Sequence, residues 1–302
     1  MVHFGFASSS LKTRTFWENL IPEKLLYYRG PLNVGEITGL LPGGDVHGVG
    51  WQLPGDFNQV WSNDRLFRLW QRFLNELNKH GVKIIGLDCT TTFAPPKSLR
   101  NETPFPGVSD GKALEMLLFV NRFRSILRNY EIQPLKAKAT IVWEEGNLGV
   151  TCARLVAREV RFLNLVSPNE HSLERAADLI FAETGISAQT YQTLPEELHG
   201  SRILIKCGII SELKLVRARE AKKMIWCEIF QKSPSLTSFN ANLPLRVKNK
   251  FGGLPLYPAL GEVILRSRFN LIDGFWYGSD LPLERVVKLA LCFRELGCDF
   301  TV

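Results

Sequence analysis

Several features that would point directly to a function are missing from this chain of 302 residues. It has no uncharged apolar run of 18 residues and no charged-then-apolar leader ending in small residues. We therefore expect no transmembrane helix, no signal peptide and a cytoplasmic location. The chain also shows no internal repeat and no low-complexity tract, which argues against a repeat protein.

Patterns typical of disulfides and metal sites are missing as well. The 6 Cys residues are scattered without CxxC spacing, and the 5 His residues show no ligand spacing. Cys152, Cys207 and Cys227 fall inside apolar segments. We therefore expect reduced thiols and no metal.

The charge is basic, with a formal net charge of +7 and a pI near 9.1. The basic residues are dispersed apart from small groups such as Arg217–Arg219 with Lys222–Lys223, so we do not expect a nucleic-acid partner. Two interpretations stay open. The charge is either a solvated basic face or the complement of an acidic partner, whether a phosphate cofactor or an acidic acyl carrier protein.

The first part of the chain predicts a mixed α/β domain of substrate-binding type over residues 1–136. The segment "SNDRLFRLWQRFLNELNKHG" has apolar residues at three-and-four spacing and ends at Gly81, which predicts a helix. "VKIIGLDCTTTF" predicts a buried strand with a polar tip. A second long helix is expected over "DGKALEMLLFVNRFRSILRNY".

Residues 137–250 alternate regularly between strand and helix patterns. Strands are expected at "TIVW", "RFLNLVS", "RILIKC" and "MIWCEIF", with helices between them. One helix has Ser172 as its expected N-cap and Gly185 at its end. This alternation predicts a Rossmann-like parallel sheet, and thus an α/β fold class. Residues 251–302 are expected to form a C-terminal helical segment that packs on the other two parts.

The turn after the first strand of this second domain is the main candidate for a cofactor site. Gly146, Asn147, Leu148 and Gly149 stand where backbone amides could hold the pyrophosphate of NAD or NADP. Trp143, however, occupies the first position of a G-x-x-G-x-x-G pattern, and two glutamates follow it. Two like charges about 4 Å apart repel by roughly 4 kcal/mol at an effective dielectric near 20, which would weaken phosphate binding.

The end of the next strand gives no clear cofactor signature. An acidic residue there would bind the ribose hydroxyls, and an arginine would bind a 2′-phosphate. The chain instead has Ser167, Pro168 and Asn169, with Glu170 just beyond. Ser167 and Asn169 are the candidate cofactor contacts at this tip. The alternative is a Rossmann core that no longer binds a dinucleotide.

From end to end, the chain resembles the long-chain acyl–acyl-carrier-protein reductases, whose two-domain plan shikimate dehydrogenases and glutamyl-tRNA reductases share more distantly. "HGVKIIGLDCTTTF" is similar to their strand ending in a Gly-Gly-Phe-Ser-Ser turn, and "IVWEEGNLG" stands at their G-A-T-G-x-I-G turn. "GGLPLYPALGEVIL" resembles their Gly-Gly stretch followed by Ala-Cys-Phe-Ala-Glu. The resemblance implies reduction of an acyl thioester to an aldehyde with NADPH, through an acyl-cysteine.

The resemblance breaks at the nucleophile. Alignment on Glu262 places Ala259 at the family's cysteine, and an alanine cannot form a thioester. Glu262 is a candidate catalytic acid, or else a paired or helix-surface carboxylate. Cys89 and Cys207 are candidate nucleophiles, or else core-edge thiols. Thr90, Thr91 and Thr92 are candidate substrate contacts, or else caps of the strand.

Two functions follow from these patterns. One is an NAD(P)-dependent reductase acting on a small carbonyl or thioester substrate with altered catalytic residues. The other is a non-catalytic Rossmann-fold descendant that acts as a binding or regulatory protein.

Overall fold

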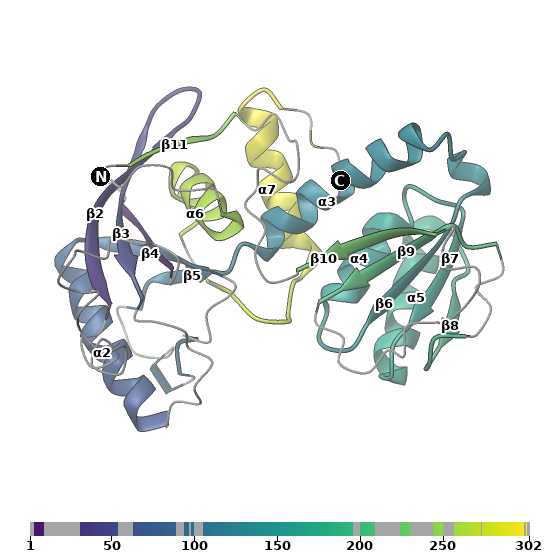
Figure 1. Ribbon diagram of the computed structural model, residues 1–302, viewed down its shortest axis with the longest axis horizontal. Helices are drawn as coiled ribbons and strands as arrows, with labels where there is room; N and C mark the ends of the chain where they lie inside the picture. Colours follow the sequence, from purple (N-terminus) through teal and green to yellow (C-terminus); the bar gives the residue numbers. More distant parts are fainter. Residues whose placement is uncertain are drawn as a thin grey trace, which may run out of the picture. The chain divides into compact units, whose positions relative to one another are not determined.

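The computed structural model forms two compact units (Figure 1). Unit 1 comprises Met1–Leu114, Lys232–Tyr277 and Leu291–Asp299, and unit 2 comprises Glu115–Gln231, Gly278–Ala290 and Phe300–Val302. The residues described are 3–8, 31–53, 63–88, 94–96, 98–99, 105–195, 200–208, 224–230, 244–249, 257–272, 274–298 and 300.

Unit 1 is built on a mixed sheet with the strand order β11-β2-β3-β1-β4-β5-β12. Its strands are β1 (His3–Ser8), β2 (Leu32–Leu40), β3 (Val46–Gln52), β4 (Val82–Leu87), β5 (Gly107–Ser109), β11 (Arg246–Asn249) and β12 (Phe275–Trp276). The run from β3 to β12 is parallel, whereas β2 pairs antiparallel with β3 and β11 antiparallel with β2. Its helices are α2 (Asn63–Lys79) and α6 (Pro258–Arg268).

Helices α2 and α6 pack on opposite faces of this sheet. Trp70 and Phe73 of α2 belong to one buried cluster with Trp51 of β3 and Ile85 of β4. On the other face, a Cβ added at Gly86 of β4 would meet α6. Alternate strand residues therefore point to the two faces, and each face is covered by a helix.

Unit 2 is built on a parallel sheet with the strand order β10-β9-β6-β7-β8. Its strands are β6 (Lys138–Trp143), β7 (Phe162–Val166), β8 (Gln189–Tyr191), β9 (Ile203–Cys207) and β10 (Ile225–Ile229). Its helical elements are α4 (Leu148–Val156), α5 (Glu170–Thr184) and the short 3-10 turn η3 (Pro134–Lys136). Two further helices, α3 (Lys112–Asn129) and α7 (Leu283–Glu295), contain the boundaries between the units.

The fold class predicted from the sequence is confirmed. Counted from β6, the sheet of unit 2 has the order 3-2-1-4-5 of a Rossmann-like half, in which the strand order reverses between β6 and β9. Helices α4 and α5 follow β6 and β7 and lie beside the sheet (Figure 1). A ligand of such a sheet binds at the carboxyl ends of the strands beside this reversal.

One detail differs from the sequence-based expectations, and two further expectations stay predictions. The expected domain ranges 1–136, 137–250 and 251–302 stay predictions; in the two compact units, α6 belongs to unit 1 and residues 278–290 to unit 2. The N-cap of α5 is Asn169 rather than Ser172, since the Asn169 side chain accepts a hydrogen bond from the Ser172 amide. The helix expected at "KLVRAREAKK" lies outside the described residues.

Gly185 does end α5 in the left-handed conformation, as expected. Among the described residues, no helix combines the length and the apolar character needed to cross a bilayer.

Candidate functional site

The turn between β6 and α4 requires glycine at both positions, because other residues of the protein pack closely against them. Gly146 has φ +65°, and a Cβ there would overlap with the carbonyl of Ser279. A Cβ at Gly149 would overlap with the ring of Trp143. The two glycines therefore make room for a later chain segment and for an indole.

Trp143 is buried at the carboxyl end of β6. Its side chain is 1% exposed, and its Nε1 donates a hydrogen bond to Oγ of Ser172, 3.2 Å away in the first turn of α5. The indole thus lies against the first turn of α4 at Gly149 and reaches the first turn of α5. A Rossmann domain holds the adenosine side of a dinucleotide in this region, beside the ends of its first two strands.

A segment of the same chain, Ser279–Leu281, closes over the N-terminus of α4. The Asn147 amide donates to the Ser279 carbonyl at 2.9 Å, and the Asn147 side chain donates to Oδ1 of Asp280 at 2.5 Å. The Thr151 hydroxyl donates to the Leu281 carbonyl. Asp280 therefore places a carboxylate where a helix N-terminus would otherwise attract a ligand's phosphate.

The two candidate residues at the end of β7 support the local backbone. Ser167 is fully buried, and its Oγ accepts the Asn169 amide at 3.3 Å. Asn169 caps α5. The side chains of Ser167 and Asn169 thus bond to backbone amides, and none of residues 167–169 carries a carboxylate to bind the ribose hydroxyls.

The residues of this turn do not fit a bound dinucleotide. One amide of the glycine turn is bonded to Ser279, and an indole fills the space beside it. Asp280 adds a negative charge that would repel a pyrophosphate. The cofactor contacts predicted at Gly146, Asn147, Leu148, Gly149, Ser167 and Asn169 stay predictions, and the geometry opposes them.

Cys207 is one of three buried thiols in unit 2. It ends β9 and is 3% exposed, and Cys152 of α4 and Cys227 of β10 interact with it. Burial raises the pKa of Cys152 well above its ordinary value and that of Cys227 to about 11. A buried thiol group of this kind favours the core-edge interpretation over a nucleophile. Cys89, Thr90, Thr91 and Thr92 lie outside the described residues.

Glu262 is fully buried in unit 1, where it joins α6 to the start of α3. Its Oε1 accepts the Ser109 hydroxyl at 2.7 Å, and its Oε2 accepts the Leu114 amide at 3.0 Å. Burial raises the pKa of Glu262 to about 7, although Arg266 opposes the shift. A carboxyl group that titrates near neutrality is a candidate for proton transfer, but its two oxygens are also structural acceptors here.

Other polar side chains are paired at the same edge of the unit 1 sheet, and sequence reasoning did not bring them together. Lys112 pairs with Asp110 at 2.9 Å directly after β5. At the ends of β1 and β4, the Ser8 hydroxyl donates to Asp88 at 2.8 Å. The available signal was that Ser8, Asp88 and Asp110 each end or follow a buried parallel strand, so their side chains reach the same sheet edge.

Ala259 is buried at the start of α6. Its backbone lies so close to Gly86 and Gly111 that a Cβ on either glycine would overlap with it. With a methyl side chain at this position, the covalent route implied by the family resemblance cannot pass through residue 259. Among the described residues, no cluster of His, Cys, Asp or Glu could hold a metal ion.

No family model matches the chain, and no curated protein matches it. The acyl–acyl-carrier-protein reductase resemblance therefore stays a prediction. Solved structures similar to the chain include quinate dehydrogenase from Corynebacterium glutamicum in complex with NAD, with 10% identity and a TM-score of 0.37, over 99% of this chain and 94% of that one.

Shikimate 5-dehydrogenase from Listeria monocytogenes, in complex with shikimate and NAD, has 10% identity and a TM-score of 0.33, over 76% of this chain and 86% of that one. L-tryptophan dehydrogenase from Nostoc punctiforme has 16% identity and a TM-score of 0.33 over 62% of this chain, which spans about half (51%) of that enzyme. Likenesses this distant carry no conclusion about function.

Proposed function

We propose that this chain is a Rossmann-fold protein that acts by binding a partner, and that it does not use a nicotinamide cofactor at the turn after β6. The observation that carries the proposal is the closure of that turn by Ser279–Leu281. Its contacts with Asn147 and Thr151 supply the acceptors and the negative charge that a pyrophosphate would otherwise provide.

The test is a titration of the full chain with NADPH and with NADH, followed by energy transfer from its 7 Trp residues. We expect no binding up to millimolar concentration, which corresponds to an affinity weaker than about −4 kcal/mol. Asp280→Asn, which removes the negative charge at the turn, is titrated in the same way as the matched variant of the wild type.

Micromolar binding by the wild type would overturn the proposal. The nicotinamide would be located at the turn if Asp280→Asn tightened the binding and Gly146→Val abolished it.

The second candidate is an NAD(P)-dependent oxidoreductase with a carbonyl or thioester substrate, of which an acyl–acyl-carrier-protein reductase is the narrower form. Glu262, with a pKa raised to about 7 beside the Asp110–Lys112 pair, favours it. The assay is oxidation of NADPH with acyl thioesters and aldehydes. Turnover that Glu262→Gln abolishes without loss of folding would support this candidate over the first.

A further inference from the structure

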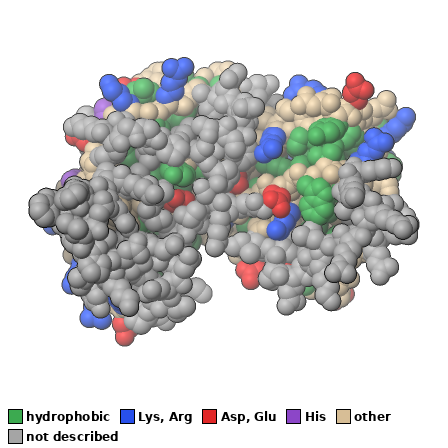
Figure 2. All heavy atoms as spheres, in the orientation of Figure 1, with side chains coloured by type: hydrophobic (Ala, Val, Ile, Leu, Met, Phe, Trp, Pro, Cys, Tyr) green, Lys and Arg blue, Asp and Glu red, His purple; other side chains and the backbone are tan. Residues whose placement is uncertain are grey.

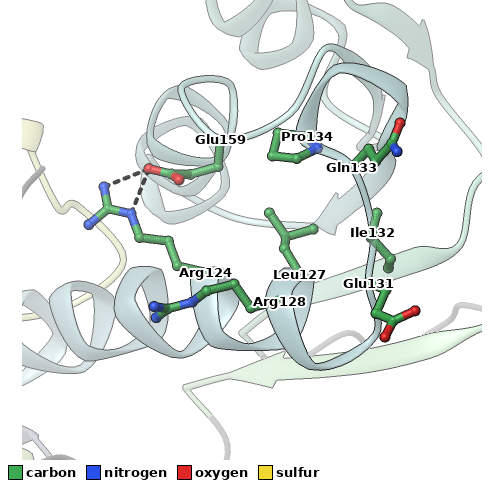
Figure 3. A pocket seen from close by; sticks show the side chains of 8 residues that line it. All are labelled: Arg124, Leu127, Arg128, Glu131, Ile132, Gln133, Pro134 and Glu159. Carbon is green, nitrogen blue, oxygen red and sulfur yellow. Dashed lines mark hydrogen bonds and ion pairs between the residues drawn. The ribbon is translucent and has the colours of Figure 1, made fainter.

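Unit 2 carries a surface hollow that none of the sites above uses. It has a volume of about 550 Å³ and lies at the C-terminal end of α3. Figure 3 shows Leu127 pointing toward Pro134, with Ile132 beside them and the ion pair of Arg124 and Glu159 at one side. Arg124 donates to Glu159 through two nitrogens, at 2.9 and 2.6 Å. The hollow is thus lined by three apolar side chains and this ion pair, and also by Arg128, Glu131 and Gln133.

Large apolar side chains are exposed around this hollow. In the described part of the chain, 6 large hydrophobic side chains are exposed, and Tyr130, Leu135 and Phe162 are half of them. Leu135 is 78% and Phe162 51% exposed, and backbone hydrogen bonds join residues 134–137 to residues 161–162. Tyr130, Leu135 and Phe162 thus do not line the hollow but lie on chain segments that border it, and exposed apolar groups close together are typical of an interaction surface.

The two arginines and two glutamates that line the hollow balance in charge, and the neighbouring Lys136 and Arg161 add positive charge beside it. Arg128, Lys136 and Arg161 are exposed, and none of them has an ion-pair partner among the described residues. Two acidic residues line the hollow, Glu131 and Glu159, and Glu159 is paired with Arg124. On the visible face of unit 2, Figure 2 shows hydrophobic side chains with both basic and acidic side chains beside them.

We propose that this surface binds an acidic polypeptide segment that places one bulky apolar side chain in the hollow. Protein interfaces combine an apolar core with a charged rim, and aromatic and arginine side chains are enriched in them. The exposed Leu135 and Phe162 lie beyond the walls of the hollow, so a polypeptide would cover them and a small molecule would not. The inference goes beyond the binding role proposed above, since it names the partner's chemistry, and it does not depend on the state of the glycine turn.

The experiment uses the full chain and a fluorescently labelled short peptide of Asp, Glu and Ser with one central Phe. Binding is followed by fluorescence anisotropy at low and high salt. We expect saturable binding that weakens about tenfold at high salt, because the rim charges attract the peptide from exposed positions. The same peptide with Ser in place of its Phe is expected to bind several-fold more weakly.

Two variants and a matched control locate the binding. Arg128→Glu reverses a rim charge and is expected to weaken binding about tenfold, whereas Phe162→Ser is expected to weaken it several-fold without changing the salt dependence. Arg175→Glu makes the same charge change at an exposed position of α5 that does not line the hollow, and is expected to leave binding within about twofold. Each of these positions is exposed, so the variants are expected to keep the wild-type melting temperature.

Three results would overturn the inference: no binding of the peptide, binding that ignores salt, or equal losses in Arg128→Glu and Arg175→Glu. The NADPH titration separates this failure from that of the proposed function. Peptide binding together with nicotinamide binding at the turn would overturn the closed turn alone, whereas binding of neither peptide nor nicotinamide would overturn only the docking surface for an acidic peptide.

Discussion

The mixed sheet of unit 1 and the parallel sheet of unit 2 differ in what lies at the carboxyl ends of their parallel strands. In unit 2, the edge after β6 is closed by a buried indole and by backbone carbonyls of Ser279 and Leu281. In unit 1, the corresponding edge keeps buried ionisable groups, with Glu262 against Ser109 and Asp110 against Lys112. The same architectural position thus serves packing in one unit and holds titratable groups in the other.

This difference teaches that a glycine turn does not by itself identify a cofactor site. Glycine is required wherever another group approaches the backbone closely, whether that group is a pyrophosphate or a side chain. Here the approaching groups belong to the protein. Three sets of substitutions can break or sharpen the contrast between the closed edge and the titratable one.

The largest effect is expected from the indole in the closed edge. Trp143→Ala should lower the free energy of unfolding by about 3–5 kcal/mol, because it removes a fully buried aromatic side chain. Gly149→Ala should cost about 2 kcal/mol, since its Cβ would overlap with the indole. Urea unfolding measures both changes.

In the double variant, the new methyl enters space that the indole has left. We expect its loss to be smaller than the sum of the single losses by about 1 kcal/mol or more. Strict additivity would show that Trp143 does not pack on Gly149.

The next effect concerns the titratable edge. The folded-state pKa of Glu262 is raised from 4.5 to about 7, so the folded protein holds this proton more tightly than the unfolded chain. The resulting stabilisation is fully present below about pH 4.5 and is lost as the pH rises through about 7. Relative to Glu262→Gln, the wild type should lose about 3 kcal/mol of unfolding free energy across this window.

Urea unfolding at a series of pH values measures this loss. Glu174→Gln, at an exposed position of α5, is the control and should keep the wild-type pH profile. Parallel profiles of wild type and Glu262→Gln would mean that Glu262 does not titrate in this range.

The smallest effect is expected from the side-chain contact that closes the turn. Asn147→Ala removes the hydrogen bond to Asp280 and should cost about 1 kcal/mol in unfolding free energy. Asp280→Ala should cost a similar amount, and the double variant little more than either, because both remove one contact. Asp178→Ala, at another exposed acid of unit 2, is the control for loss of charge. Additive losses at 147 and 280 would show that these two side chains do not contact one another.

Much of the fold was predictable from local patterns. The three-and-four spacing of apolar residues predicted α2 and α3, and the alternation after Pro134 predicted the parallel sheet of unit 2. The N-cap of α5 was misassigned by three residues because Asn169 and Ser172 are both good capping residues at the start of one helix.

The candidate site was less predictable. Local sequence identified the Gly146–Gly149 turn and the awkward Trp143, but left the direction of the indole open. The burial of Glu262 also lay beyond local patterns, because its two hydrogen-bond donors come from residues about 150 positions earlier in the chain.

By itself, the sequence determined which segments become strands and helices and where the glycine turn falls, since these follow from spacing and backbone conformation within a few residues. Only the tertiary structure decided what meets that turn. Ser279–Leu281 contact it from some 130 residues away in the chain. The Trp143 indole packs against Gly149 of α4 and bonds to Ser172 of α5. Contacts between distant segments depend on how whole elements pack, and no local pattern encodes them.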